Sequence, residues 1–132
     1  MARPLNSMGL TPSRRDIMPT LLIVEDDSAI LESVTDIAKE GGYLVAPARD
    51  ADEALNLLER GGISVVLTDL QMPGSIDGFA LVRRVAQQWP DVALIIMSGW
   101  VRPFPGTLPP GAEFLGKPFK EEALAKLLLA AA

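Results

Sequence analysis

The residues best suited to chemistry are acids, a lysine and a hydroxyl that each follow a short apolar run. The longest of these runs are rich in Val, Leu and Ile, as expected for strands that are buried on both faces of a sheet. In chain order the polar residues that follow them are Glu25, Asp26, Asp27, Asp69, Ser98 and Lys117. In an open parallel sheet, functional groups gather at the carboxyl ends of the strands. The sequence therefore predicts that these side chains share one rim of a sheet.

Such a rim would have a specific chemistry. Clustered carboxylates repel each other, which raises their pKa values and destabilises the fold unless a cation compensates. Mg²⁺ suits this need because it prefers one or two carboxylates, a carbonyl oxygen, waters and phosphate oxygens. Next to such an ion, the carboxylate of Asp69 can attack phosphorus and form an aspartyl phosphate. The ammonium group of Lys117 and the hydroxyl of Ser98 can each contact a phosphoryl oxygen.

Each of these residues also has a simpler interpretation. Asp27 is equally suited to cap the N-terminus of the helix that is expected to follow it. Asp69 or Lys117 alone would more often be a solvated surface charge, and Ser98 before a glycine fits ordinary turn chemistry. The combination at successive strand ends favours a functional site over these separate interpretations.

The composition narrows the possible chemistry. The chain has no Cys and no His, which excludes disulfides, thiolate nucleophiles, imidazole bases, His- or Cys-ligated zinc and phosphohistidine. A formal charge of −5, with no basic face on any expected helix, argues against nucleic acid as a partner. The 132 residues suit one domain, and no apolar run reaches the ~18 residues of a membrane span. We therefore expect a cytoplasmic protein with no membrane partner.

The elements that must position the rim alternate between strand and helix, which is typical of a parallel sheet with helices on both faces. Strands are expected at residues 20–24, 43–46, 65–68, 92–97 and 113–115. Helices are expected at 28–40, from an Asp50 and Glu53 capping box to Gly61, at 78–89 and at 120–131. Residues 1–19 lack periodicity and are expected to form a disordered extension, which leaves 20–132 as the folded domain.

One expected helix is missing from this alternation of strands and helices. Between the last two expected strands lies VRPFPGTLPPGA, which contains Pro103, Pro105, Pro109 and Pro110. Each proline inside a helix costs about 3 kcal/mol, so we predict a proline-stiffened loop in place of the fourth helix. Such a loop would lose little entropy on docking, and Phe104 and Leu108 are its predicted exposed anchors for a partner protein.

Together, the segments IVEDD, TDLQMPGSIDG, IIMSG and FLGKPF resemble the receiver domain of bacterial two-component response regulators. The resemblance extends from Thr20 to about Ala131 and implies a flavodoxin-like, doubly wound α/β fold with strand order 2-1-3-4-5. It implies that Asp69 is the phosphoacceptor and that Lys117 binds the phosphoryl group. It also implies a cis peptide bond between Lys117 and Pro118.

The resemblance assigns roles to further residues. The implied switch pair is Ser98 and Phe114, although Phe114 lacks the hydroxyl of a tyrosine. The implied Mg²⁺ ligands are Glu25, Asp26, Asp69 and the backbone carbonyl of Gln71. Asp26 is the expected direct ligand, and Asp27 is the less favoured member of the acidic group.

The implied function is that of a stand-alone receiver. It would take a phosphoryl group from the phosphohistidine of a sensor histidine kinase or a histidine phosphotransfer protein, and would signal through contacts with a downstream protein. Such a protein is not a conventional enzyme, since it catalyses at most its own phosphorylation and dephosphorylation. A receiver-like interaction module that is not phosphorylated is the alternative, because the interval from Ser98 to Lys117 is unusually short. A haloacid dehalogenase type of phosphatase is disfavoured, because Gln71 stands where that family has a second Asp.

Overall fold

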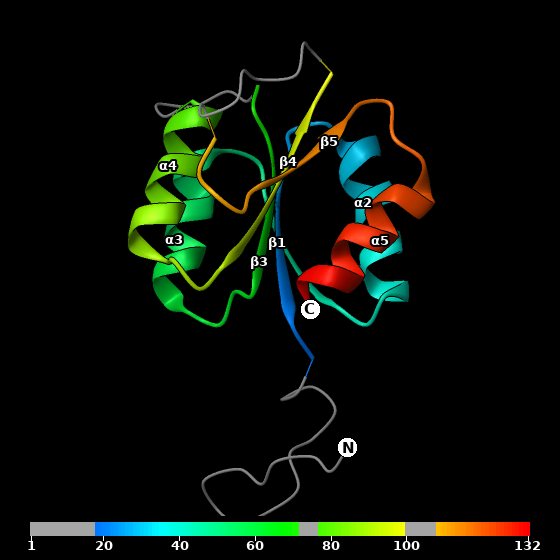
Figure 1. The fold of residues 1–132 in the computed structure, drawn as a ribbon, viewed down its shortest axis with the longest axis horizontal. Helices are drawn as coiled ribbons and strands as arrows, with labels where there is room; N and C mark the ends of the chain where they lie inside the picture. Colours follow the sequence, from blue (N-terminus) through cyan, green and yellow to red (C-terminus); the bar gives the residue numbers. More distant parts are fainter. Residues whose placement is uncertain (1–17, 72–76, 100–107) are drawn as a thin grey trace, which may run out of the picture.

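The computed structural model describes residues 18–71, 77–99 and 108–132 (Figure 1). The described residues form five strands and four helices, all of them at the expected places and with ends that differ by two residues at most. In chain order the elements are β1 (Thr20–Val24), α2 (Ser28–Glu40), β2 (Leu44–Ala48), α3 (Ala51–Arg60), β3 (Val65–Asp69), α4 (Gly78–Gln88), β4 (Ala93–Ser98), β5 (Glu113–Gly116) and α5 (Glu121–Ala131).

The strands form one parallel sheet in the order β2-β1-β3-β4-β5, which confirms the predicted topology. Helices α2 and α5 cover one face of this sheet, and α3 and α4 cover the other (Figure 1). Because all the strands are parallel, their carboxyl ends lie along the same edge, at the top of Figure 1. The fold therefore brings the residues after β1, β3, β4 and β5 to one rim.

Strand β3 is the central strand, and every one of its residues is buried. Its side chains alternate between the two faces, so that Val66 packs on the α3 and α4 side while Val65 and Leu67 pack on the α2 and α5 side. Both faces are apolar, which explains the nearly continuous Val and Leu sequence that precedes Asp69. At the edge of the second face, the buried hydroxyl of Tyr43 donates a hydrogen bond to the carbonyl of Leu128 near the end of α5.

Aspartates cap helices α2, α3 and α4. The Asp50 carboxylate accepts a hydrogen bond from the Glu53 N–H at 2.8 Å, as a capping box requires. The return bond differs from the expected one, because the Glu53 carboxylate accepts from the Arg49 N–H at 3.3 Å and not from the N–H of the cap residue Asp50.

Helix α4 begins against the end of β3, where a Cβ added to Gly78 would lie 2.4 Å from the Leu70 carbonyl oxygen. Only glycine allows this close approach without movement of the backbone.

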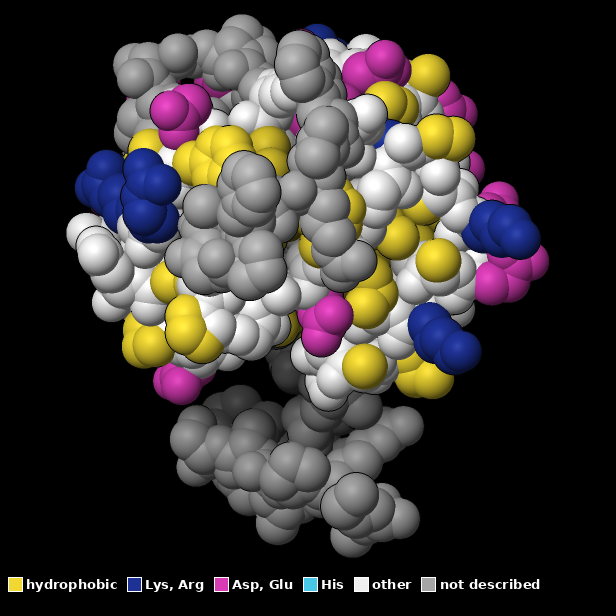
Figure 2. Space-filling model, turned by 45° about the horizontal axis from the view of Figure 1, so that its top comes forward, with side chains coloured by type: hydrophobic (Ala, Val, Ile, Leu, Met, Phe, Trp, Pro, Cys, Tyr) yellow, Lys and Arg dark blue, Asp and Glu magenta, His cyan; other side chains and the backbone are white. Residues whose placement is uncertain are grey.

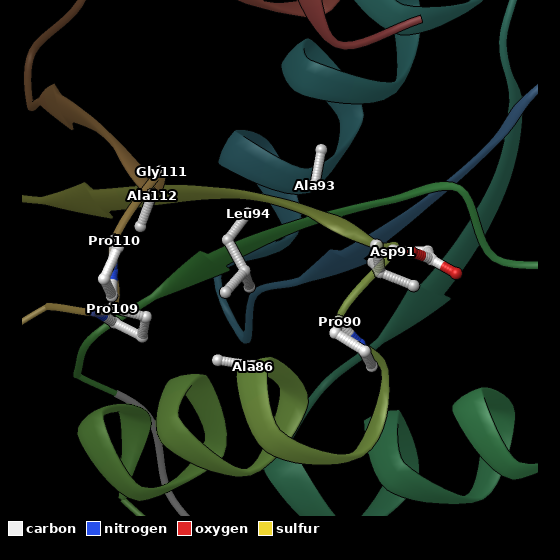
Figure 3. Close-up of a pocket in the computed structure, with 10 residues that line it drawn as sticks. Ala86, Pro90, Asp91, Ala93, Leu94, Pro109, Pro110, Gly111 and Ala112 are labelled. Carbon is white, nitrogen blue, oxygen red and sulfur yellow. The ribbon is translucent and has the colours of Figure 1, made fainter.

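The proline-rich interval is described in part. Residues 100–107, which include Phe104, lie outside the described ranges, as do residues 1–17 of the expected extension. The described part of the interval, Gly99 and residues 108–112, contains no helix. A groove of about 410 Å³ lies between α4, β4 and residues 109–112, with Ala86 and Leu94 directed into it (Figure 3). Within the described ranges, no helix has the length and apolar character needed to span a membrane.

Candidate functional site

Three of the polar residues predicted to share a rim meet at the carboxyl edge of the sheet. Glu25 follows β1, Asp69 ends β3 and Lys117 follows β5. The Lys117 Nζ lies 3.3 Å from Glu25 Oε2 and also forms an ion pair with Asp69 Oδ2. Glu25 is 1% exposed and Asp69 is 7% exposed. One lysine thus bridges two buried carboxylates that come from different strands.

Backbone amides hold the other oxygen of each carboxylate. The Gln71 N–H donates to Asp69 Oδ1 at 2.9 Å, and the Asp27 N–H donates to Glu25 Oε1 at 3.3 Å. The strand ends that carry these groups are also fixed, because the Lys117 N–H donates to the Ser98 carbonyl at 2.8 Å. The positions of the charged groups are therefore set by the backbone as well as by their mutual attraction.

The buried charges perturb one another. Burial raises the pKa of Glu25 to about 7, against the opposing attraction of Lys117 and with a further upward contribution from the negative charge of Asp69. Burial alone would lower the pKa of Lys117, but its hydrogen bond to Asp69 and the negative charges of Glu25 and Asp69 raise it instead. Lys117 therefore stays charged at neutral pH, and its single positive charge lies between two carboxyl groups.

The three consecutive acids after β1 have separate environments. Glu25 is buried, whereas Asp26 and Asp27 are exposed. Asp27 caps α2, and its Oδ1 accepts from the N–H groups of Ala29 at 2.9 Å and Ile30 at 3.2 Å. No three carboxylate side chains gather into a possible metal-binding cluster within residues 18–71, 77–99 and 108–132. The rim therefore contains a close Glu25 and Asp69 pair, and Asp26 stands beside it in solvent.

The remaining predicted residues lie on β3 to β5 or beyond them. Ser98 ends β4 and is buried, and Gln71 is exposed directly after the end of β3. Phe114 lies on β5 and packs half-buried against the core on the α3 and α4 side. Leu108 packs half-buried against the same core, so its side chain is less exposed than the anchor that the sequence predicts. The predicted cis bond between Lys117 and Pro118 is confirmed.

Thr68 is a residue at this site that the sequence patterns did not single out. Its side chain is fully buried on β3, and its Oγ1 donates to the backbone carbonyl of Asp69 at 3.0 Å. The residue was overlooked because it completes an apolar run and has a β-branched side chain that suits a strand. The signal that could have identified it is a hydroxyl in a strand buried on both faces, immediately before a charged residue.

An apolar groove of about 460 Å³ lies next to the ion pairs. It is formed by the first turns of α2 and by the segment after β5, and it is lined by Ala29, Ile30, Ser33, Lys117, Pro118 and Phe119. Figure 2, in which the top of Figure 1 is turned forward, shows apolar side chains between charged ones on the visible face. On this face the coloured Lys and Arg side chains form separate groups and not one continuous basic patch.

Comparison with known proteins identifies the family. The model of the response regulator receiver domain matches residues 21–129, and the chain belongs to this family. A solved structure of the chemotaxis response regulator CheY4 of Vibrio cholerae has a TM-score of 0.76 and 28% identity, over 87% of this chain and 99% of that one. A receiver domain structure from Clostridium thermocellum has a TM-score of 0.73 and 27% identity, over 86% and 94%.

Curated relatives include longer proteins. The response regulator protein FleR of Pseudomonas aeruginosa is 32% identical over 111 residues, which are 82% of this chain and 23% of FleR. The sensor kinase CckA of Brucella abortus is 35% identical over 111 residues, 80% of this chain and 12% of CckA. The chain thus spans less than a quarter of the length of each of these two relatives.

Proposed function

We propose that this receiver domain accepts a phosphoryl group on Asp69 and signals through contacts with other proteins. The donor would be the phosphohistidine of a sensor histidine kinase or of a histidine phosphotransfer protein. The observation that carries this proposal is the position of the Asp69 carboxylate, which lies at a strand end between the Gln71 N–H and the ammonium group of Lys117. A nucleophile held in this way by backbone and lysine is restricted to few orientations, which favours in-line attack.

Phosphoryl transfer to Asp69 would be a displacement in which the donor imidazole leaves. A carboxylate oxygen of Asp69 attacks the phosphorus, an O–P bond forms and the P–N bond of the donor breaks, and the imidazole nitrogen keeps the bonding electron pair. The ammonium group of Lys117 can then contact a phosphoryl oxygen, since it already lies beside Asp69. The hydroxyl of Ser98, at the end of the neighbouring strand β4, is the proposed donor to another oxygen.

The side chains at the rim are suited to bind Mg²⁺. Two buried carboxylates face one lysine, and the pKa of Glu25 is raised to about 7, so the site lacks positive charge. Mg²⁺ needs only one or two carboxylates from the protein, so the lack of a three-carboxylate cluster in the described residues does not oppose this fit. The proposed direct ligands are Asp26, Asp69 and the Gln71 carbonyl, and Glu25, the other member of the acidic pair, would add negative charge beside the ion. When bound, the ion would neutralise charge on the phosphoryl oxygens.

The partner surfaces follow from the same arrangement. A phosphohistidine must reach Asp69 at the rim, and the apolar groove beside Lys117 offers contact area for the protein that carries it. For the downstream partner we propose the proline-rich interval, with Phe104 and Leu108 as contacts. Residues 109–112 at the end of this interval line the groove of Figure 3. Replacement of both residues by Ser should weaken partner binding and leave phosphorylation of Asp69 intact.

Phosphorylation with a small phosphodonor tests the proposal. Acetyl phosphate with Mg²⁺ should add one phosphoryl group per chain, measured by intact mass, and Asp69→Asn should take up none. Asp50→Asn is a matched control, because Asp50 follows the edge strand β2, its carboxylate caps α3, and Asn caps a helix equally well. A wild-type chain that stays unlabelled would favour the alternative of an unphosphorylated interaction module, which the shortened interval before β5 supports.

A further inference from the structure

Thr68 is out of place in a strand that is buried on both faces. The other residues of β3 before Asp69 are Val65, Val66 and Leu67, and all of them are fully buried. A hydroxyl in such an environment costs free energy unless it forms a hydrogen bond, and valine has nearly the same shape without that cost. Thr68 meets the requirement locally, because its Oγ1 donates to the Asp69 carbonyl at 3.0 Å.

This hydrogen bond holds one end of the peptide unit between Asp69 and Leu70. The other end of the same unit is held by β4, because the Leu70 N–H donates to the Met97 carbonyl at 3.2 Å. The orientation of this peptide plane directs the chain as it leaves the strand. It therefore decides where the next N–H groups point.

The orientation of this peptide unit affects the Asp69 carboxylate through Gln71. The Gln71 N–H donates to Asp69 Oδ1 at 2.9 Å, so its direction helps to set the rotamer of the Asp69 side chain. The Gln71 carbonyl, proposed above as a ligand for Mg²⁺, belongs to the same segment. A peptide unit that is held at both ends keeps these groups in register with Lys117, which contacts the second oxygen of Asp69.

We propose that Thr68 is a positioning residue for phosphoryl transfer, which acts by fixing the peptide unit that follows Asp69. This inference rests on the proposed function of Asp69 as phosphoacceptor. Loss of the hydroxyl should slow the chemical step at saturating donor and leave the half-saturating concentration of donor unchanged, because the groups that bind the donor remain in place. One neutral hydrogen bond corresponds to about a five-fold change in rate.

Two substitutions separate the hydroxyl from the packing of the side chain. Thr68→Val keeps the branched shape and removes the hydroxyl, whereas Thr68→Ser keeps the hydroxyl and removes a methyl group. With acetyl phosphate and Mg²⁺, Thr68→Val should lower the maximal phosphorylation rate about five-fold, and Thr68→Ser should stay within about two-fold of wild type. Urea unfolding of both variants controls for stability.

A second measurement does not depend on activity. The amide resonance of Gln71 reports its hydrogen bond to Asp69 Oδ1, so it should shift in Thr68→Val and remain near its wild-type position in Thr68→Ser. If Thr68→Val does not unfold cooperatively, Thr68→Ala replaces it in both measurements, with the same expected order relative to Thr68→Ser.

The outcomes distinguish this inference from the function on which it rests. A normal maximal rate in Thr68→Val, or an equal loss of rate in Thr68→Ser, would overturn the role of the hydroxyl while Asp69 remains the phosphoacceptor. Complete lack of labelling in the wild-type chain would instead overturn the proposed function, and the positioning role with it. Slow Thr68→Val together with normal Thr68→Ser supports the inference.

Discussion

The ends of β1 and β3 carry acids of the same chemical type in very different environments. At the end of β3 a single aspartate, Asp69, is buried and held by a backbone N–H and by Lys117. At the end of β1 three consecutive acids separate, so that Glu25 is buried with Lys117, Asp26 is exposed and Asp27 caps a helix. The role of each carboxylate therefore depends on its environment, and substitutions at the two strand ends can test each role separately.

The largest expected effect is at the end of β3. Asp69→Asn removes the nucleophilic oxygen and should abolish phosphoryl uptake, because an amide cannot form the acyl phosphate. Asp27→Asn at the end of β1 should be labelled normally, since Asn still caps α2. Intact mass after incubation with acetyl phosphate and Mg²⁺ measures both. Stoichiometric labelling of Asp69→Asn would contradict the assignment.

The second effect concerns stability and pH at Glu25. Its pKa in the folded chain is about 7, above the ordinary value of 4.5. Below pH 4.5 the carboxyl is protonated in both the folded and the unfolded state, so it carries no penalty. Between pH 4.5 and about 7 the unfolded state loses the proton first, so the free energy of unfolding falls as pH rises. Above that range a penalty of about 3 kcal/mol remains.

Glu25→Gln should remove this penalty. In the absence of Mg²⁺ the variant should be more stable than wild type at pH 8 by up to about 3 kcal/mol and equally stable near pH 4. Urea unfolding in the presence of a chelator at several pH values measures the difference. Glu40→Gln is a suitable control because Glu40 is exposed at the end of α2. Stability curves that run parallel for wild type and Glu25→Gln would argue against a raised pKa.

The third effect separates the neighbours Asp26 and Asp27. Loss of a residue that only supports a metal ligand commonly lowers the affinity for the metal by about ten-fold or more. Asp26→Ala removes a proposed direct ligand, so it should weaken Mg²⁺ binding by at least about ten-fold. Asp27→Ala should change the affinity by less than about two-fold, because its carboxylate is engaged with the amides of α2. Titration calorimetry with Mg²⁺ compares the two variants. The reverse order of affinities would exchange the two assignments.

The smallest effect is structural and falls on Asp27. Asp27→Ala should lower the free energy of unfolding by about 1 kcal/mol, because the first N–H groups of α2 lose their acceptor. Asp27→Asn should recover most of this loss. Urea unfolding measures both variants, and an unchanged stability in Asp27→Ala would mean that the exposed cap contributes little.

Much of the fold and part of the site follow from local patterns. The apolar periodicities and the glycine and proline positions predicted each strand and helix within two residues. The meeting of Glu25, Asp69 and Lys117 was predictable because residues at the carboxyl ends of parallel strands must share an edge. Asp27 could be predicted as a helix cap, because a cap contacts only the next three residues of the chain, although the sequence also allowed a role as metal ligand.

The order of the elements and the residue types at the rim therefore follow from the sequence alone. The packing of distant segments decided how deeply each residue is buried: Glu25 is buried, Asp26 is exposed, and Leu108 packs half-buried against the core. It also decided that the Thr68 hydroxyl holds the Asp69 carbonyl. The physical reason is that periodicity and capping depend on neighbours within a few residues, whereas burial, and with it the pKa of Glu25, depends on segments far apart in the chain, such as Lys117.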